Sequence, residues 1–208
     1  MPVVTIRGQL GSGAPEIGKL VADKLHTDYV DREIIADVAA RLAWSEEAVA
    51  AKEMPPGTLL GRIAEALGRS ATHEGAYLPA WQIPLDDTRY LVGLESVIKE
   101  LASSQSIVIC GRGSQFILRD HPDALHVLIV APLELRLKRV TETMNLDGET
   151  AKNEIARSDS SHREFTKRYF QAELEDSVNY DLIINTENLD FEVAASIIVG
   201  ALPFKAGQ

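Results

Sequence analysis

The sequence predicts an α/β fold of three layers, in which a five-stranded parallel sheet lies between helices. Five short apolar runs predict the strands, at 3–6, 28–30, 106–110, 124–130 and 181–185. The third and fourth runs are almost continuously apolar and rich in β-branched residues, as parallel strands covered on both faces are. Helical patterns alternate with these runs, which is typical of βαβ units.

Helical periodicity covers eight stretches: 15–25, 32–43, 87–103, 114–119, 132–144, 148–158, 160–175 and 190–201. Two segments interrupt the alternation. Segment 54–86 contains several prolines and glycines, a short helical pattern near 58–68 and no clear strand, whereas segment 141–176 is polar and helical. We therefore expect a single domain over 1–208, with a core of 1–53, 87–140 and 177–208, a flap at 54–86 and a lid at 141–176.

Composition limits the possible function classes. The 208 residues are 45% hydrophobic and 25% charged, as in soluble globular proteins. A net charge of −10 disfavours a broad nucleic-acid surface. No apolar stretch approaches the ~20 residues that cross a bilayer, and the N-terminal residues carry no signal-peptide pattern. The single cysteine excludes an intrachain disulfide. We expect a cytoplasmic protein whose partners are small molecules, with neither nucleic acid nor membrane among them.

A glycine-rich loop follows the first predicted strand and precedes the first predicted helix. Gly8 and Gly13 have the spacing of the glycines in G-x-x-x-x-G-K-[ST], and Gly11 and Ser12 lie between them. Glycines let backbone N–H groups converge on an anion, and a helix N-terminus adds partial positive charge. This context favours a phosphate-binding loop, although a tight turn without a ligand is the alternative.

The loop departs from this motif at its cation. Ala14 stands at the lysine position and Pro15 at the Ser/Thr position. Pro15 suits the first turn of a helix. A replacement cation is available from Arg7 before the loop or from Lys19 one turn into the helix, and Arg7 is preferred because strand-end side chains face such sites. A surface role for Arg7 is the alternative.

Five segments in order along the chain resemble the cytidylate kinase-like family of P-loop proteins. They are Gly-Ser-Gly-Ala-Pro-Glu-Ile-Gly at 11–18, Tyr-Val-Asp-Arg-Glu-Ile-Ile at 29–35, Val-Ile-Cys-Gly-Arg-Gly-Ser at 108–114, Val-Ala-Pro-Leu-Glu-Leu-Arg-Leu-Lys-Arg-Val at 130–140 and Tyr-Asp-Leu-Ile-Ile-Asn-Thr at 180–186. The resemblance implies a nucleoside monophosphate kinase fold. It also implies transfer of the γ-phosphoryl group of ATP, with Mg²⁺, to CMP or a related acceptor.

The resemblance also implies roles for individual residues. The expected nucleotide contacts are Gly8, Gly11, Ser12, Gly13, Ala14, Pro15, Arg136, Arg139 and Asn185, and the expected acceptor contacts are Asp31 and Arg112. Arg7, Arg157 and Arg163 are the candidate catalytic cations. No metal ligand is certain, and Ser12 is the one possible ligand. The alternatives are a helix cap for Asp31, a solvated turn for Arg112, an ordinary polar strand end for Asn185, and solvated helix pairs for much of the basic lid.

Two further positions bear on the acceptor. Cytidylate kinases carry Asp-Gly-Arg-Asp where this chain has Cys110-Gly111-Arg112-Gly113. Both flanking carboxylates are therefore missing, which places CMP specificity in doubt. Three hypotheses follow: a nucleoside monophosphate kinase, a weakly active or inactive nucleotide-binding regulator of the same fold, and a kinase of a small non-nucleotide metabolite.

Overall fold

The computed structural model describes residues 1–31, 33–42, 45–52 and 87–205. Its sheet has five strands in the order β2-β3-β1-β4-β5, and every neighbouring pair is parallel. Val3 of the central strand is in register with Ile107 on one side and with Ala124 on the other. The predicted α/β class and five-stranded parallel sheet are confirmed.

The elements follow one another in the alternating order that the sequence predicts. The strands are β1 (Val3–Gly8), β2 (Asp28–Val30), β3 (Ile107–Cys110), β4 (Ala124–Val130) and β5 (Leu182–Asn185). The α-helices are α1 (Ala14–Leu25), α2 (Glu33–Leu42), α3 (Glu46–Ala51), α5 (Asp87–Ser104), α6 (Ser114–Ile117), α7 (Leu133–Met144), α8 (Gly148–Phe170) and α9 (Phe191–Lys205), and a short 3₁₀ helix covers Ser177–Asn179. Within the described ranges, no helix has the length and apolar character needed to span a bilayer.

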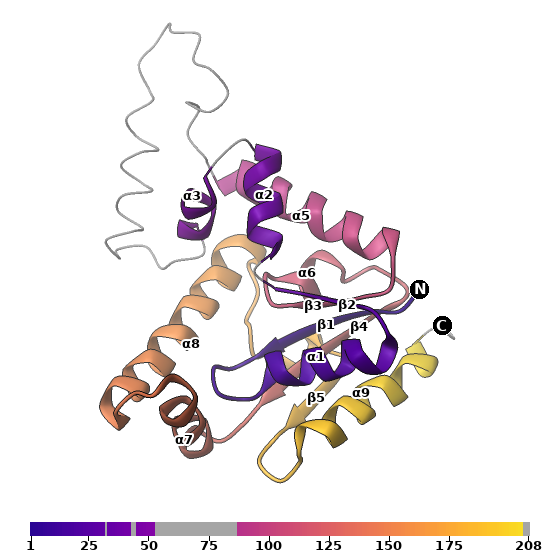
Figure 1. Ribbon diagram of the computed structural model, residues 1–208. Coiled ribbons are helices and arrows are strands. Elements are labelled where there is room, and N and C mark those ends of the chain that lie inside the picture. The colour runs from indigo at the N-terminus through magenta and orange to yellow at the C-terminus, as the bar shows by residue number, and fades with distance from the viewer. Residues whose placement is uncertain (32, 43–44, 53–86, 206–208) are drawn as a thin grey trace, which may run out of the picture.

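Helices cover both faces of the sheet, which makes three layers (Figure 1). One core cluster joins Val3 of β1 to side chains of α2, α3 and α5. The other joins Val4 and Ile6 of β1 to side chains of α1 and α9. Because strand side chains alternate between faces, Arg7 lies on the same face as Val3. That face also receives Tyr169 of α8, and α8 runs past the carboxyl ends of the strands (Figure 1).

Several boundaries differ from those expected. The predicted helices 148–158 and 160–175 are one helix, α8, whose C-cap residue Gln171 has a left-handed conformation. Its central serines do not break it, because Ser161 bonds to the carbonyl of Arg157 and Ser160 to the carboxylate of Glu164. Strand β1 extends to Gly8 instead of ending at residue 6, because its last residues pair with β4. The sequence did not predict helix α3. The flap at 54–86, including its helical pattern near 58–68, lies outside the described residues.

Candidate phosphate loop and acceptor site

The glycine-rich loop connects β1 to α1, and its close packing explains its glycines. Gly11 and Gly13 have φ angles of 81° and 91°, a region that side-chain-bearing residues avoid. A Cβ on Gly13 would lie 2.3 Å from the ring of Phe191. A Cβ on Gly8 would lie 2.2 Å from the Cβ of Ala14 and 2.7 Å from the Oγ of Ser12. The loop therefore folds tightly on itself, with small side chains facing Gly8.

The start of α1 leaves polar groups without protein partners. Gly13 is the N-cap and supplies no side-chain hydrogen bond. Among the described residues, none accepts a hydrogen bond from the amides of Gly13, Ala14 or Glu16. The Oγ of Ser12 is fully buried and also lacks a partner in this part of the chain. Open amides at the positive end of a twelve-residue helix suit an anion such as a phosphate.

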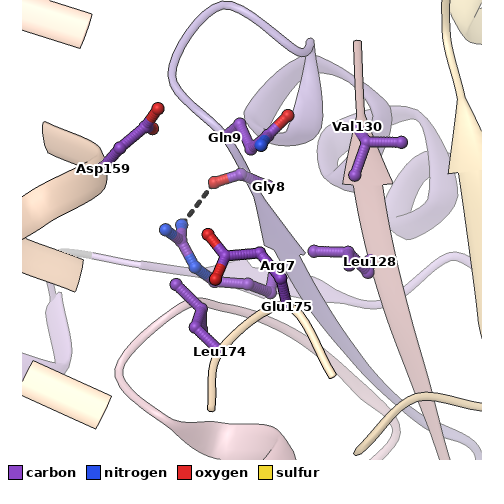
Figure 2. Close-up of a pocket in the computed structure, with 8 residues that line it drawn as sticks. All are labelled: Arg7, Gly8, Gln9, Leu128, Val130, Asp159, Leu174 and Glu175. Carbon is purple, nitrogen blue, oxygen red and sulfur yellow. Dashed lines mark hydrogen bonds between the residues drawn. The ribbon is translucent and has the colours of Figure 1, made fainter. Parts of the chain in front are cut away.

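Arg7 lies beside this loop, as the sequence suggested for a replacement cation. Its guanidinium donates a hydrogen bond to the carbonyl of Gly8. Figure 2 shows Arg7 in a small pocket that is also lined by Gly8 and Gln9 and by residues of β4, α8 and the segment before β5. Burial lowers the pKa of Arg7 from its ordinary value, and the carboxylates of Asp159 and Glu175 oppose that shift. Arg7 is therefore a cation at the edge of the loop, whereas Lys19 has the ring of Tyr29 as a neighbour, 6.0 Å away.

The turn after β3 brings Arg112 to the carboxyl edge of the sheet. Gly111, Arg112 and Gly113 all have positive φ angles, of 76°, 58° and 69°. A nitrogen of the Arg112 guanidinium lies 3.6 Å from a carboxylate oxygen of Asp31, which follows the neighbouring strand β2. The structure thus brings together the two residues predicted to contact the acceptor.

Cys110 and Gly113, which stand where cytidylate kinases carry aspartates, are uncharged. Burial, together with the charge of Asp31, raises the pKa of the Cys110 thiol to about 11, so the thiol is neutral near pH 7. A Cβ on Gly113 would lie 2.2 Å from the ring of Phe170 at the end of α8. That ring stacks on Phe116 with the centroids 5.0 Å apart. Both positions therefore belong to the packed core around the site.

Helix α8, which falls in the segment predicted to be a lid, has residues both inside and outside the site. Asp159 lines the pocket of Arg7 and binds Arg136, with 2.7 Å between oxygen and nitrogen. His162, one turn further along, has its pKa lowered to about 3 by burial and by the charges of Arg7 and Arg112. The ring of His162 is therefore neutral near pH 7.

The two predicted lid arginines point to other partners. Arg157 pairs with Glu154 of the same helix at 2.6 Å, and 61% of its side chain is exposed. Arg163 pairs with Glu175, at 3.4 Å, and is half exposed. Because Glu175 lines the pocket of Arg7, Arg163 lies near the site through this carboxylate, while Arg157 lies on the outer face of α8. Their catalytic roles stay predictions.

Arg136 and Arg139 of α7 bind the phosphate loop itself. Arg136 donates to the carbonyl of Leu10, and Arg139 donates to the carbonyls of Gly11 and Ser12. Thr186, directly after β5, is buried and donates to the same carbonyl of Ser12. The sequence placed Thr186 beside Asn185 at the end of the last predicted strand, but it did not predict the bond from Thr186 to the loop. The neighbouring Asn185 is exposed and its side chain accepts the amide of Glu187.

The described residues supply no dedicated metal cage. They contain no group of three or more His, Cys, Asp or Glu side chains placed to hold an ion. The carboxylates of Asp31, Asp159 and Glu175 each face an arginine. The Oγ of Ser12 is the buried loop oxygen that could face an ion.

Comparisons with known proteins agree with this architecture. A crystal structure of an uncharacterized protein from Eubacterium ventriosum superposes with a TM-score of 0.68 at 20% identity, covering 98% of this chain and 99% of that one. Curated relatives named cytidylate kinase come from Methanocaldococcus jannaschii, at 24% identity over 96% of this chain and 97% of the relative, and from Sulfolobus acidocaldarius, at 27% over 97% and 94%.

A sequence profile of the cytidylate kinase-like family matches residues 3–188, which include the glycine-rich loop, Arg112 and α8. The chain therefore belongs to the cytidylate kinase-like family, which supports a kinase of a nucleotide or a small metabolite and implies the use of ATP.

Proposed function

We propose that the protein transfers the γ-phosphoryl group of ATP to a nucleoside monophosphate, with a CMP-like acceptor. The observation that carries this proposal is the pairing of two anion sites at one sheet edge. The open amides of the loop at the start of α1 offer one site. Arg112, beside Asp31, offers the other. Curated relatives of nearly equal length are named cytidylate kinase, which supports the same acceptor class.

The chemistry needs positioning and charge neutralisation more than covalent catalysis. An oxygen of the acceptor phosphate attacks the γ-phosphorus in line as the bond to the bridging oxygen of ADP breaks. The loop amides would hold the donor phosphates, and Arg112 would hold the acceptor phosphate with its planar guanidinium. Arg7 would supply the cation nearest to the transferred group. Mg²⁺ would enter with the phosphates of ATP and neutralise part of their charge.

A second candidate is a nucleotide-binding regulator with little or no turnover. Ala14 in place of the lysine supports it, because losing one preorganised donor at a developing charge costs about 10²–10³ in rate. The neutral Cys110 and the covered Gly113 support it further, since neither supplies a carboxylate. A kinase of a small hydroxylated metabolite is the third hypothesis, and the acceptor panel below includes it.

The experiment that separates these candidates compares the wild type with Ala14→Lys. Purified proteins are assayed for ATP-dependent phosphorylation of CMP, dCMP, UMP and a panel of small alcohols, and ATP binding is measured by calorimetry. We expect slow wild-type turnover of CMP, which the introduced cation raises. Tighter ATP binding without turnover in either protein would favour the regulator. Fast wild-type turnover that survives replacement of Arg7, Arg157 and Arg163 together would contradict our account of the missing lysine.

A further inference from the structure

Every carbonyl of the phosphate loop from Gly8 to Gly13 accepts a hydrogen bond. The guanidinium of Arg7 donates to the carbonyl of Gly8, and the amide of Ser12 donates to that of Gln9. Nε of Arg136 donates to the carbonyl of Leu10 at 2.8 Å, and Nη1 of Arg139 donates to those of Gly11 and Ser12, both at 3.3 Å. The carbonyl of Ser12 also accepts from Oγ1 of Thr186 at 2.8 Å, and that of Gly13 accepts from the amide of Ile17 at 2.9 Å. The carbonyls of the loop are thus satisfied within the protein, whereas the amides at its end are open.

Arg139, which donates to two of these carbonyls, is itself held in place by further contacts. Arg139 donates from Nη1 to the Oγ1 of Thr186 at 2.9 Å and from Nη2 to the carbonyl of Thr186 at 3.1 Å. Its guanidinium lies 5.0 Å from the ring centroid of Phe191, the ring that also packs against Gly13. These contacts therefore connect the loop to α7, to the end of β5 and to the start of α9.

The peptide between Ser12 and Gly13 joins a hydrogen-bonded carbonyl to one of the open amides. The C=O and N–H of a trans peptide point in opposite directions. The carbonyl of Ser12 accepts from Arg139 and from Thr186, while the amide of Gly13 faces the open start of α1. Hydrogen bonds to a carbonyl polarise the peptide and strengthen its N–H as a donor. A fixed donor also needs no reorganisation when charge develops near it.

We propose that Arg139 and Thr186 are positioning residues, which hold the phosphate loop by the carbonyl of Ser12 and strengthen the Gly13 amide toward a phosphate on the opposite side. This inference rests on the proposed use of the loop as a phosphate site. It differs from the direct nucleotide contact expected for Arg139 from the sequence, because Nη1 and Nη2 both engage the loop or Thr186. Positive charge behind the loop then compensates in part for the lysine that Ala14 replaces.

The test uses Thr186→Val, Arg139→Gln, their combination and Lys138→Gln. Thr186→Val removes the hydroxyl without changing charge, and Lys138→Gln removes a positive charge from the exposed side of the same helix. Amide hydrogen exchange is measured without ligand at Ser12, whose amide bonds to the carbonyl of Gln9, and at Val21 in the buried core as a reference for global stability. Binding of inorganic pyrophosphate is measured by calorimetry.

We expect Thr186→Val and Arg139→Gln each to raise exchange at Ser12 and to weaken pyrophosphate binding by about tenfold, with little change at Val21. Because both act on one carbonyl, the double variant is expected to lose less than the product of the two single losses. Lys138→Gln is expected to match the wild type in all measurements.

Normal pyrophosphate binding by Thr186→Val, with a loss confined to Arg139→Gln, would overturn the inference in favour of direct contact. Unchanged exchange at Ser12 in both variants would overturn it as well. If Arg139→Gln does not fold, Thr186→Val decides the question alone. An absence of phosphoryl transfer by the wild type, with the exchange and pyrophosphate results as expected, would contradict the proposed kinase while supporting the positioning role.

Discussion

Restoring an aspartate at position 113 tests how the turn after β3 is built. Gly113 has a φ angle of 69° and caps the short helix α6. Its missing side chain leaves room for Phe170, whose ring would lie 2.2 Å from an added Cβ. Phe170 packs on Phe116 with the centroids 5.0 Å apart and contacts Phe165 with the centroids 5.9 Å apart. Gly113→Asp therefore strains the backbone and displaces an aromatic ring from two neighbours.

The expected cost follows from these two effects. A left-handed conformation costs a non-glycine residue about 1–2 kcal/mol. Losing the aromatic contacts costs about 0.5–1.5 kcal/mol beyond area burial. We expect Gly113→Asp to lower the free energy of unfolding by about 2–3 kcal/mol. In a Phe170→Ala background the ring is already absent, so the same substitution is expected to cost about 1–2 kcal/mol, the backbone contribution alone.

Urea unfolding of the wild type, both single variants and the double variant completes this cycle. Gly113→Ala serves as the matched control, because it adds the Cβ without the carboxylate. The reasoning is refuted if Gly113→Asp is as stable as the wild type, or if its cost is the same with and without Phe170. A phosphorylation assay of the double variant with CMP then asks whether the introduced carboxylate increases the rate with this acceptor.

Two further predictions concern the charges that face the acceptor side. Arg112→Ala is expected to leave the melting temperature nearly unchanged, since both side chains carry a Cβ at this positive φ. The same variant is expected to weaken nucleoside monophosphate binding by about 1.5–3 kcal/mol. Equal binding by wild type and variant in calorimetry would argue against this prediction. The depressed pKa of His162, about 3 against an ordinary 6.5, predicts that the free energy of unfolding falls as pH drops from 6.5 toward 3, because the unfolded chain binds a proton that the folded chain excludes. Between pH 7 and 4.5, His162→Asn is expected to remove at most about 2–3 kcal/mol of this pH dependence, and a ring that titrates near 6.5 by NMR would contradict the prediction.

The sequence by itself determined the layout of the protein. Apolar periodicity predicts the strands and most helices, because burial on a sheet or helix face leaves a local pattern of period 2 or 3.6. Parallel strands bring their carboxyl ends to one edge, so the ends of β2 and β3 predicted the neighbourhood of Asp31 and Arg112, which the structure finds 3.6 Å apart. The glycine pattern likewise predicted a loop whose close packing excludes larger side chains.

The tertiary structure alone decided which side chains act on which part of the loop. From sequence, Arg136 and Arg139 are basic residues on one helix face, and a charge on such a face suits a nucleotide as well as it suits a carbonyl. Docking of α7 on Gly11 aims them at the backbone of the loop, and the bond from Arg136 to Leu10 spans 126 positions of the chain. The same holds for Phe170 over Gly113. Local patterns encode which face of an element is buried, whereas the partner of a buried polar or aromatic group depends on packing between elements distant in sequence, which no local pattern records.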